Sequence, residues 1–155
     1  MKNKSNIDLV KYEGFFTDIE TVCIRVTGDD ATDFLQGQLT NDVRKLSNGE
    51  YQISSYLTNQ GKVIAIFRIF KDKDEYILLI NKKISEYFIN KISNFILRSK
   101  VLFNYDENIY VTIVKTKRIF DHFADLDLNK KNKCIKLVNK NIWILNYRDN
   151  LLFVH

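Results

Sequence analysis

The sequence feature that most constrains the fold is a run of strand-forming residues in the middle of the chain. Residues 62–70 read KVIAIFRIF and are apolar at nearly every position, with Arg68 as the exception. Such a run predicts a strand whose two faces are both covered. YQISSYLT (51–58) precedes it across Asn59-Gln60-Gly61, which indicates a hairpin turn, and EYILLIN (75–81) follows. We therefore expect three successive strands here.

Strand and helix patterns alternate on either side of these strands. Residues 19–27 alternate as a strand. In residues 84–97, one helical face carries Ile84, Phe88, Ile92, Phe95 and Ile96. Because there is no βαβ rhythm, the pattern predicts an α+β fold with a mostly antiparallel sheet and short helices. If the final LLFVH is an unpaired edge or a half-finished hairpin, the isolated chain should associate or aggregate. Further strands are expected at 101–105, 108–116, CIKLV, NIWILNY and LLFVH, with a short helix at 119–128 and an exposed loop at 129–133.

Composition bounds the class of protein. A chain of 155 residues with 45% hydrophobic residues is typical of one globular domain. It has no apolar run of membrane-spanning length and no secretory signal, and Cys23 and Cys134 lack metal-binding spacing. We therefore expect a reduced cytoplasmic protein that does not bind membranes, with both cysteines buried in strands.

The formal charge of +5 is concentrated in the second half of the chain. Residues 1–70 carry eight Lys or Arg against nine Asp or Glu, and residues 71–155 carry sixteen against ten. This imbalance could attract an anionic ligand or RNA. The stronger explanation is compositional, because heavy use of Lys, Asn and Ile without any Pro would arise from an AT-rich genome without selection for binding.

Recognisable catalytic motifs are absent from the sequence. His122 and His155 have no nucleophile or carboxylate at a familiar spacing, and there is no P-loop, HExxH or GxGxxG. Asp125 and Asp127 are more typical of a loop or cap than of a metal site. Trp143 alternates with two isoleucines, which predicts packing against a sheet.

The segment GDDATDFLQGQLTNDV (28–43) places neutral hydrogen-bonding groups around one bend. Asp29 or Asp30 is expected to cap a short helix that buries Phe34 and Leu35, and Gly37 to end it. The amides of Gln36, Gln38 and Asn41 have two interpretations. They can recognise a flat polar ligand without burying a charge, or they can bond backbone groups and hold the bend together.

This segment resembles the YgfZ-type folate-binding proteins, which are relatives of the glycine-cleavage aminomethyltransferase. The family block G-x-D-A-x-x-F-L-Q-G-Q-x-T-x-D-V is followed by a K-G-K/R hairpin, and the resemblance extends over residues 19–155. The matching residues are Gly28, Asp30, Ala31, Phe34, Leu35, Gln36, Gly37, Gln38, Thr40, Asp42 and Val43, then Gly61 and Lys62.

The resemblance implies a fold and a function. It implies an N-terminal α+β domain that forms one part of a three-domain ring around a folate cavity. It also implies tetrahydrofolate as ligand, and support of iron–sulfur enzymes, including those that modify tRNA. For such a ligand, the neutral amides of Gln36, Gln38 and Asn41 suit the donors and acceptors of the pteridine. Lys62 suits the anionic glutamate tail, and Asn81 coincides with an asparagine near the cofactor in the transferases.

Departures from the family pattern argue against catalysis. The carboxylate that serves the folate and the amine in the transferases falls here on Ala65 or Ile66, so aminomethyl transfer by the usual route should be lost. The family's K-G-C-Y-x-G-Q-E signature does not occur in the chain. We expect residues 1–18 to be a lead-in segment and residues 19–155 a domain truncated before the C-terminal part.

These observations predict a non-catalytic folate-binding accessory protein. Its expected partners are folate and iron–sulfur enzymes or assembly proteins, and a separate C-terminal polypeptide is a further candidate. The alternatives are an aminomethyltransferase remnant that uses tetrahydrofolate, and a basic module that binds RNA or protein. Direct binding of nucleic acid by such a basic module is the less favoured interpretation.

Overall fold

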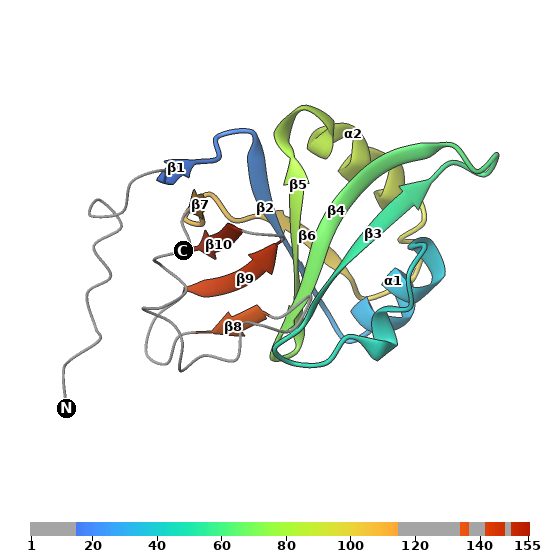
Figure 1. Ribbon diagram of the computed structural model, residues 1–155. Helices are drawn as coiled ribbons and strands as arrows, with labels where there is room; N and C mark the ends of the chain where they lie inside the picture. The colour runs from blue at the N-terminus through green and yellow to red at the C-terminus, as the bar shows by residue number, and fades with distance from the viewer. Residues whose placement is uncertain (1–14, 115–133, 137–141, 148–149) are drawn as a thin grey trace.

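Two sheets and a helical layer are stacked in this protein (Figure 1). The structure, a computed structural model, describes residues 15–114, 134–136, 142–147 and 150–155. In Figure 1, strands β7 to β10 lie on one side of the long central strands, and α1 and α2 lie on the other. The α+β class and the mostly antiparallel pairing are confirmed.

The central sheet contains the three consecutive strands that the sequence predicts. Its order is β3-β4-β5-β2-β6, and all four pairings are antiparallel. The β3–β4 hairpin turns through Gly61, whose positive φ of 78° suits glycine. Its strands are β2 (Thr21–Thr27), β3 (Tyr51–Leu57), β4 (Val63–Asp72), β5 (Glu75–Asn81) and β6 (Leu102–Tyr105).

Helices cover one face of the central sheet. These are α1 (Ala31–Gln38), the short 3-10 helix η2 (Val43–Lys45) and α2 (Lys82–Ser93). Phe88 of α2 is fully buried, and its ring lies 5.3–6.2 Å from those of Tyr56, Phe67 and Phe103. The predicted apolar face of this helix is thus confirmed at Phe88 and Ile92, which are both buried.

The second sheet packs on the opposite face of the central sheet, which we call the outer face. Its order is β1-β7-β10-β9-β8. The predicted packing of Trp143 is confirmed, because Trp143 is buried in the core between the sheets together with Cys23 and Cys134. The strands are β1 (Phe15–Thr17), β7 (Val111–Val114), β8 (Cys134–Lys136), β9 (Trp143–Tyr147) and β10 (Asn150–Val154).

Strand β10 corrects one concern raised by the sequence. It pairs with β7 on one side and β9 on the other, so the final apolar strand is at the centre of its sheet and is not an unpaired edge. The reason given for association of the isolated chain therefore does not hold. Strand β1 comes from the segment expected to be a lead-in, and it pairs with β7.

Two further expectations are wrong in detail. The helix of residues 84–97 begins at Lys82 and ends at Ser93, which leaves Phe95 45% exposed. Strand β4 is covered on both faces only in its second half, because Val63 and Ile66 are 58% and 59% exposed. The β3–β4 hairpin extends beyond the short strands of the second sheet, so nothing in the described structure covers them (Figure 1).

The predicted helix at 119–128, the loop at 129–133, and His122, Asp125 and Asp127 lie outside the described residues. Neither α1 nor α2, the α-helices that the structure describes, is long and apolar enough to cross a membrane.

Candidate functional site

The bend at residues 28–43 is anchored to the segment that leads into β6. Gly28 has a φ of 117°, and a Cβ at this position would lie 1.9 Å from the carbonyl oxygen of Lys100. The carboxylate of Asp30 accepts a hydrogen bond from the Lys100 backbone N–H at 2.7 Å. The predicted cap is therefore wrong in its mechanism: Asp30 occupies the N-cap of α1, but its side chain bonds Lys100 instead of the helix. Helix α1 also continues through Gly37 to Gln38.

Gln36 and Asn41 bond backbone groups near this bend. The side-chain oxygen of Gln36 accepts from the Val43 N–H at 2.9 Å, and the Asn41 amide donates to the Ile53 carbonyl at 2.6 Å. Gln38 is partly buried at the end of α1. Two of the three amides thus make the bonds that the structural interpretation of the bend predicts.

The bend also extends the central sheet by a short stretch beyond β3. The Thr40 N–H donates to the Ser55 carbonyl at 3.0 Å, and the Ser55 N–H donates to Thr40 Oγ1 at 3.0 Å. Ser55 is opposite Ile66 on β4, and Thr21 is opposite Asn81 on β5. The bend therefore pairs with the β3 edge of the sheet that also contains Asn81, and the β3–β4 hairpin lies between them.

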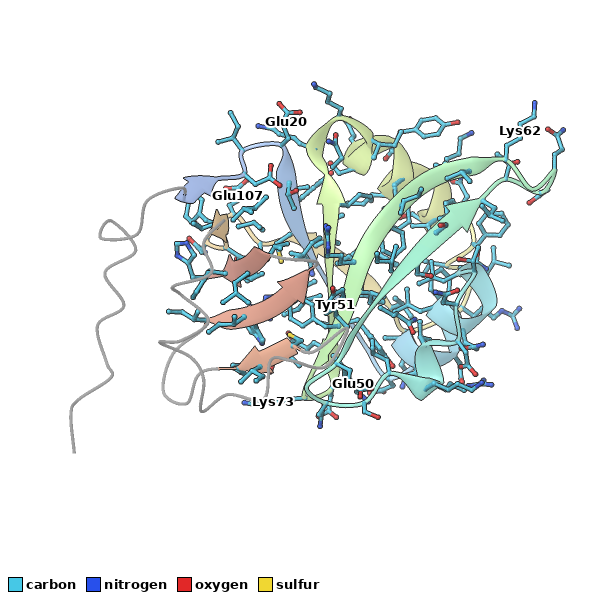
Figure 2. The ribbon with its side chains drawn as sticks, viewed as in Figure 1. Glu20, Glu50, Tyr51, Lys62, Lys73 and Glu107 are labelled. Carbon is cyan, nitrogen blue, oxygen red and sulfur yellow. The ribbon has the colours of Figure 1, made fainter. Side chains whose placement is uncertain are left out.

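The end of the outer face near the hairpin is exposed and apolar. Ile53 is 44% exposed and Ile66 is 59% exposed, and the two residues are on neighbouring strands. We call Ile53, Val63 and Ile66 the uncovered patch. Lys62 lies at the hairpin tip beyond this patch (Figure 2). The side-chain oxygen of Asn81 accepts from the Lys83 N–H at 2.9 Å, so Asn81 also caps α2.

Ala65 and Ile66, where the resemblance implies the transferase carboxylate, are both apolar. Ala65 is 3% exposed and belongs to the core under the helices, whereas Ile66 points to the exposed outer face. Ile66 is therefore the residue that a ligand on the outer face would meet. Its side chain can neither accept a proton nor bind a cation.

A separate cavity opens at the end of the sheet where β2 begins. Its volume is about 580 Å³, and no residue of the predicted folate set lines it. Sequence analysis missed it, because its walls come from three segments far apart in the chain and none of them carries a motif. The lining residues are Asp18, Ile19, Thr21, Val22, Cys23, Lys82, Ser85, Glu86, Tyr105, Asp106, Glu107, Ile109 and Tyr110.

Two of the acidic groups in this cavity are held by hydrogen bonds. Asp18 accepts from Thr21 Oγ1 at 2.6 Å and from the Glu20 N–H at 3.1 Å. Asp106 accepts from Arg25 Nε at 2.5 Å, and Arg25 also pairs with Glu75 at 2.8 Å. Burial lowers the pKa of Arg25, but the bonds to Asp106 and Glu75 outweigh it and leave that pKa raised.

Burial disfavours the reactive thiolate form of the cysteine in the cavity wall. Burial, with a smaller contribution from the Asp106 carboxylate, raises the pKa of Cys23 to about 12. Since the thiolate is the reactive form, this thiol stays protonated at neutral pH. The described residues contain no group of three or more His, Cys, Asp or Glu side chains that could hold a metal ion.

Sequence comparison finds relatives among the YgfZ proteins, although no protein-family model matches the chain. The chain is similar to tRNA-modifying protein YgfZ of Buchnera aphidicola, with 36% identity over 78 residues, and to that of Vibrio atlanticus, with 37% over 78 residues. Each match covers 50% of this chain and 24% of the relative. The chain thus matches about a quarter of the length of these relatives.

Structural comparison gives the fold. The glycine cleavage system aminomethyltransferase T of Bartonella henselae superposes with a TM-score of 0.76 and 15% sequence identity. The match covers 91% of this chain and 41% of that structure. The chain is thus similar in sequence to part of the YgfZ proteins, and it shares its fold with aminomethyltransferase T.

Proposed function

We propose that this chain is a folate-binding accessory protein of the YgfZ type that supports iron–sulfur enzymes and tRNA modification. The observation that carries the proposal is an apolar Ile66 on the outer face of an aminomethyltransferase fold. A binding surface without an acid can retain a folate while losing the transfer reaction. The relatives' name supports the tRNA-modification setting. We also propose a cytoplasmic setting, consistent with the two free cysteines.

We place the folate on the uncovered patch, between Asn41 and Asn81. Tetrahydrofolate carries a flat pterin with donors and acceptors at its edge, and its apolar faces would contact Ile53 and Ile66. Within the described residues, the Asn41 side-chain oxygen and the Asn81 amino group make no hydrogen bond, so both can serve a ligand. When bound, tetrahydrofolate would supply a carrier for one-carbon units.

The remaining residues of the predicted set lie around this surface. Lys62, at the hairpin tip, is exposed and suits the anionic glutamate tail. Gln36 and Gln38 belong to α1 and would act by fixing the bend that presents Asn41. Because the chain matches less than half the length of its relatives, a second polypeptide that completes the cavity is part of the proposal.

The test is calorimetric titration with tetrahydrofolate. It is run with the chain alone and with a polypeptide that carries the remaining length of a YgfZ relative. We expect binding that Ile66→Ser weakens about tenfold, because an aliphatic contact of this size contributes about 1–2 kcal/mol. Leu97→Ser is the matched control, since Leu97 is 87% exposed and lies outside the patch. Absence of heat in both arrangements, or equal weakening by the control, counts against a folate role.

The non-catalytic part of the proposal has a separate test. We expect no turnover in a glycine-cleavage assay in which this chain replaces the aminomethyltransferase. Measurable turnover would mean that another group supplies the missing carboxylate.

A further inference from the structure

We propose that the cavity at the start of β2 binds an organic cation: an ammonium or guanidinium group on an apolar stem. This site is distinct from the uncovered patch, and the two share no residue. Its volume of about 580 Å³ falls in the range of small-molecule sites, roughly 300–1,000 Å³. The cavity is larger than a single side chain requires, so a diamine or a short basic peptide can fit in it.

The charge of the cavity runs against the charge of the whole chain. The chain carries a formal net charge of +5, yet the cavity wall contains four carboxylates against Lys82 as its one ammonium. An anionic ligand such as RNA would be repelled here, and a cation would be attracted. Since no metal-binding group occurs in the described residues, the cation that fits is organic.

The carboxylates of the cavity divide into two kinds. Asp18 and Asp106 hold the local structure through the bonds already described. Glu86 on α2 and Glu107 beyond β6 are exposed and make no hydrogen bond or ion pair within the described part of the chain. They come from different elements and face one cavity, so they are the two groups free to bind a ligand's positive charges.

The walls supply the apolar half of the site. Ile19 and Tyr110 are 77% and 56% exposed, which is high for residues of this size at a cavity. Tyrosine rings attract cations through their faces, and an aliphatic stem can pack on Ile19. An organic cation satisfies the free carboxylates and these exposed apolar groups at once.

The site is also preformed, which reduces the cost of ordering it on binding. The hydroxyl of Tyr105 donates to Ser85 Oγ at 2.9 Å, tying β6 to α2. The backbones of Tyr110 and His155 exchange hydrogen bonds of 2.7 and 2.9 Å. The Asp18 N–H donates to the Val111 carbonyl at 2.7 Å. Each wall is thus fixed to a neighbouring element.

The experiment is NMR titration of the isotopically labelled full chain. The probes are 1,5-diaminopentane and acetyl-Arg-Arg-amide, and the neutral control is 1,5-pentanediol. We expect shifts at cavity residues with the cations alone, and affinity that falls as salt rises from about 20 to 500 mM. A preference for the diamine or for the peptide distinguishes a free small molecule from a polypeptide segment as the source of the cation.

Variants of the charged residues in the cavity should change the affinity for the cation in opposite directions. Glu86→Gln with Glu107→Gln should weaken binding about fivefold, whereas Lys82→Gln should strengthen it about twofold, as expected for exposed charges. The control is Glu50→Gln with Asp74→Asn, because these residues lie at the opposite end of the molecule. Figure 2 shows Glu50 there together with Lys73, which precedes Asp74 in the chain, and both lie far from Glu107. Equal affinity for the diol, or a Glu86/Glu107 variant that binds like the control, overturns the proposal.

Discussion

The close approach of Gly28 to Lys100 gives a quantitative prediction about the bend. Two effects oppose any side chain at Gly28. Its φ of 117° is a conformation that residues with a Cβ rarely adopt, and the Cβ would lie 1.9 Å from the Lys100 oxygen and 2.7 Å from the Lys100 carbonyl carbon. Both contacts are with backbone atoms, so relief requires the chain entering β6 to move.

Three glycine-to-alanine variants separate these effects. Gly61 also has a positive φ, of 78°, but no atom within 4 Å of its Cβ position, so Gly61→Ala should cost about 1–2 kcal/mol through conformation alone. Gly28→Ala should cost about 2–6 kcal/mol, because backbone strain of about 1–3 adds to a similar displacement term. Gly37 lies in α1 with open space around it, so Gly37→Ala should stabilise the chain by about 0.5–1 kcal/mol.

The assay is urea unfolding followed by fluorescence of the single Trp143, which is buried between the sheets. A loss for Gly28→Ala no larger than that for Gly61→Ala would refute the close-approach argument, since backbone conformation alone would then account for both variants. A destabilising Gly37→Ala would show that this glycine has a role that the structure does not reveal.

Three further predictions concern the core and the ion pairs. Phe88→Ala should cost about 3–5 kcal/mol in chemical denaturation, and more than Phe95→Ala, because Phe88 is fully buried and Phe95 is 45% exposed; similar losses would contradict the packing described. Cys23 and Cys134, each with a pKa raised to about 12, should react with a thiol reagent at pH 8 only after unfolding. Since the native state holds these protons more tightly than the unfolded state, stability should fall as pH rises from about 9 towards 12, and rapid labelling of the native chain would be inconsistent with this burial. Arg25→Met should lower the free energy of unfolding by about 1–3 kcal/mol, because the side chains of Arg25 and Asp106 are both less than a quarter exposed. A double-mutant cycle with Asp106→Asn should show coupling between the two residues. Additive losses of stability would mean that the ion pair contributes nothing.

Local patterns predict the elements whose residues lie close together in the chain. The helical spacing of Phe88 and Ile92 and the turn before Gly61 depend on neighbouring residues, and both predictions are confirmed. Trp143 is likewise correctly assigned to packing against a sheet, because alternation with apolar neighbours places it on a buried face.

Longer-range arrangements were not predictable in this way. The coverage of Ile66 depends on how far the second sheet reaches along β4, and no local pattern encodes that distance. Asp30 has the composition of a helix cap, but a backbone N–H seventy residues away competes for its carboxylate. The cavity was not predictable for the same reason, because Glu86 and Glu107 are far apart in the sequence and line one cavity only in the folded chain.

The central position of β10 has a consequence for the order of assembly. Every strand of the central sheet is in place by Tyr105, and its helices can then cover one face. The opposite face, with Phe70 and Leu79, stays bare until residues beyond 150 arrive to bridge β7 and β9. During synthesis, an intermediate with one hydrophobic face open to water should therefore persist until β10 has left the ribosome. Such an intermediate is a natural client for chaperones.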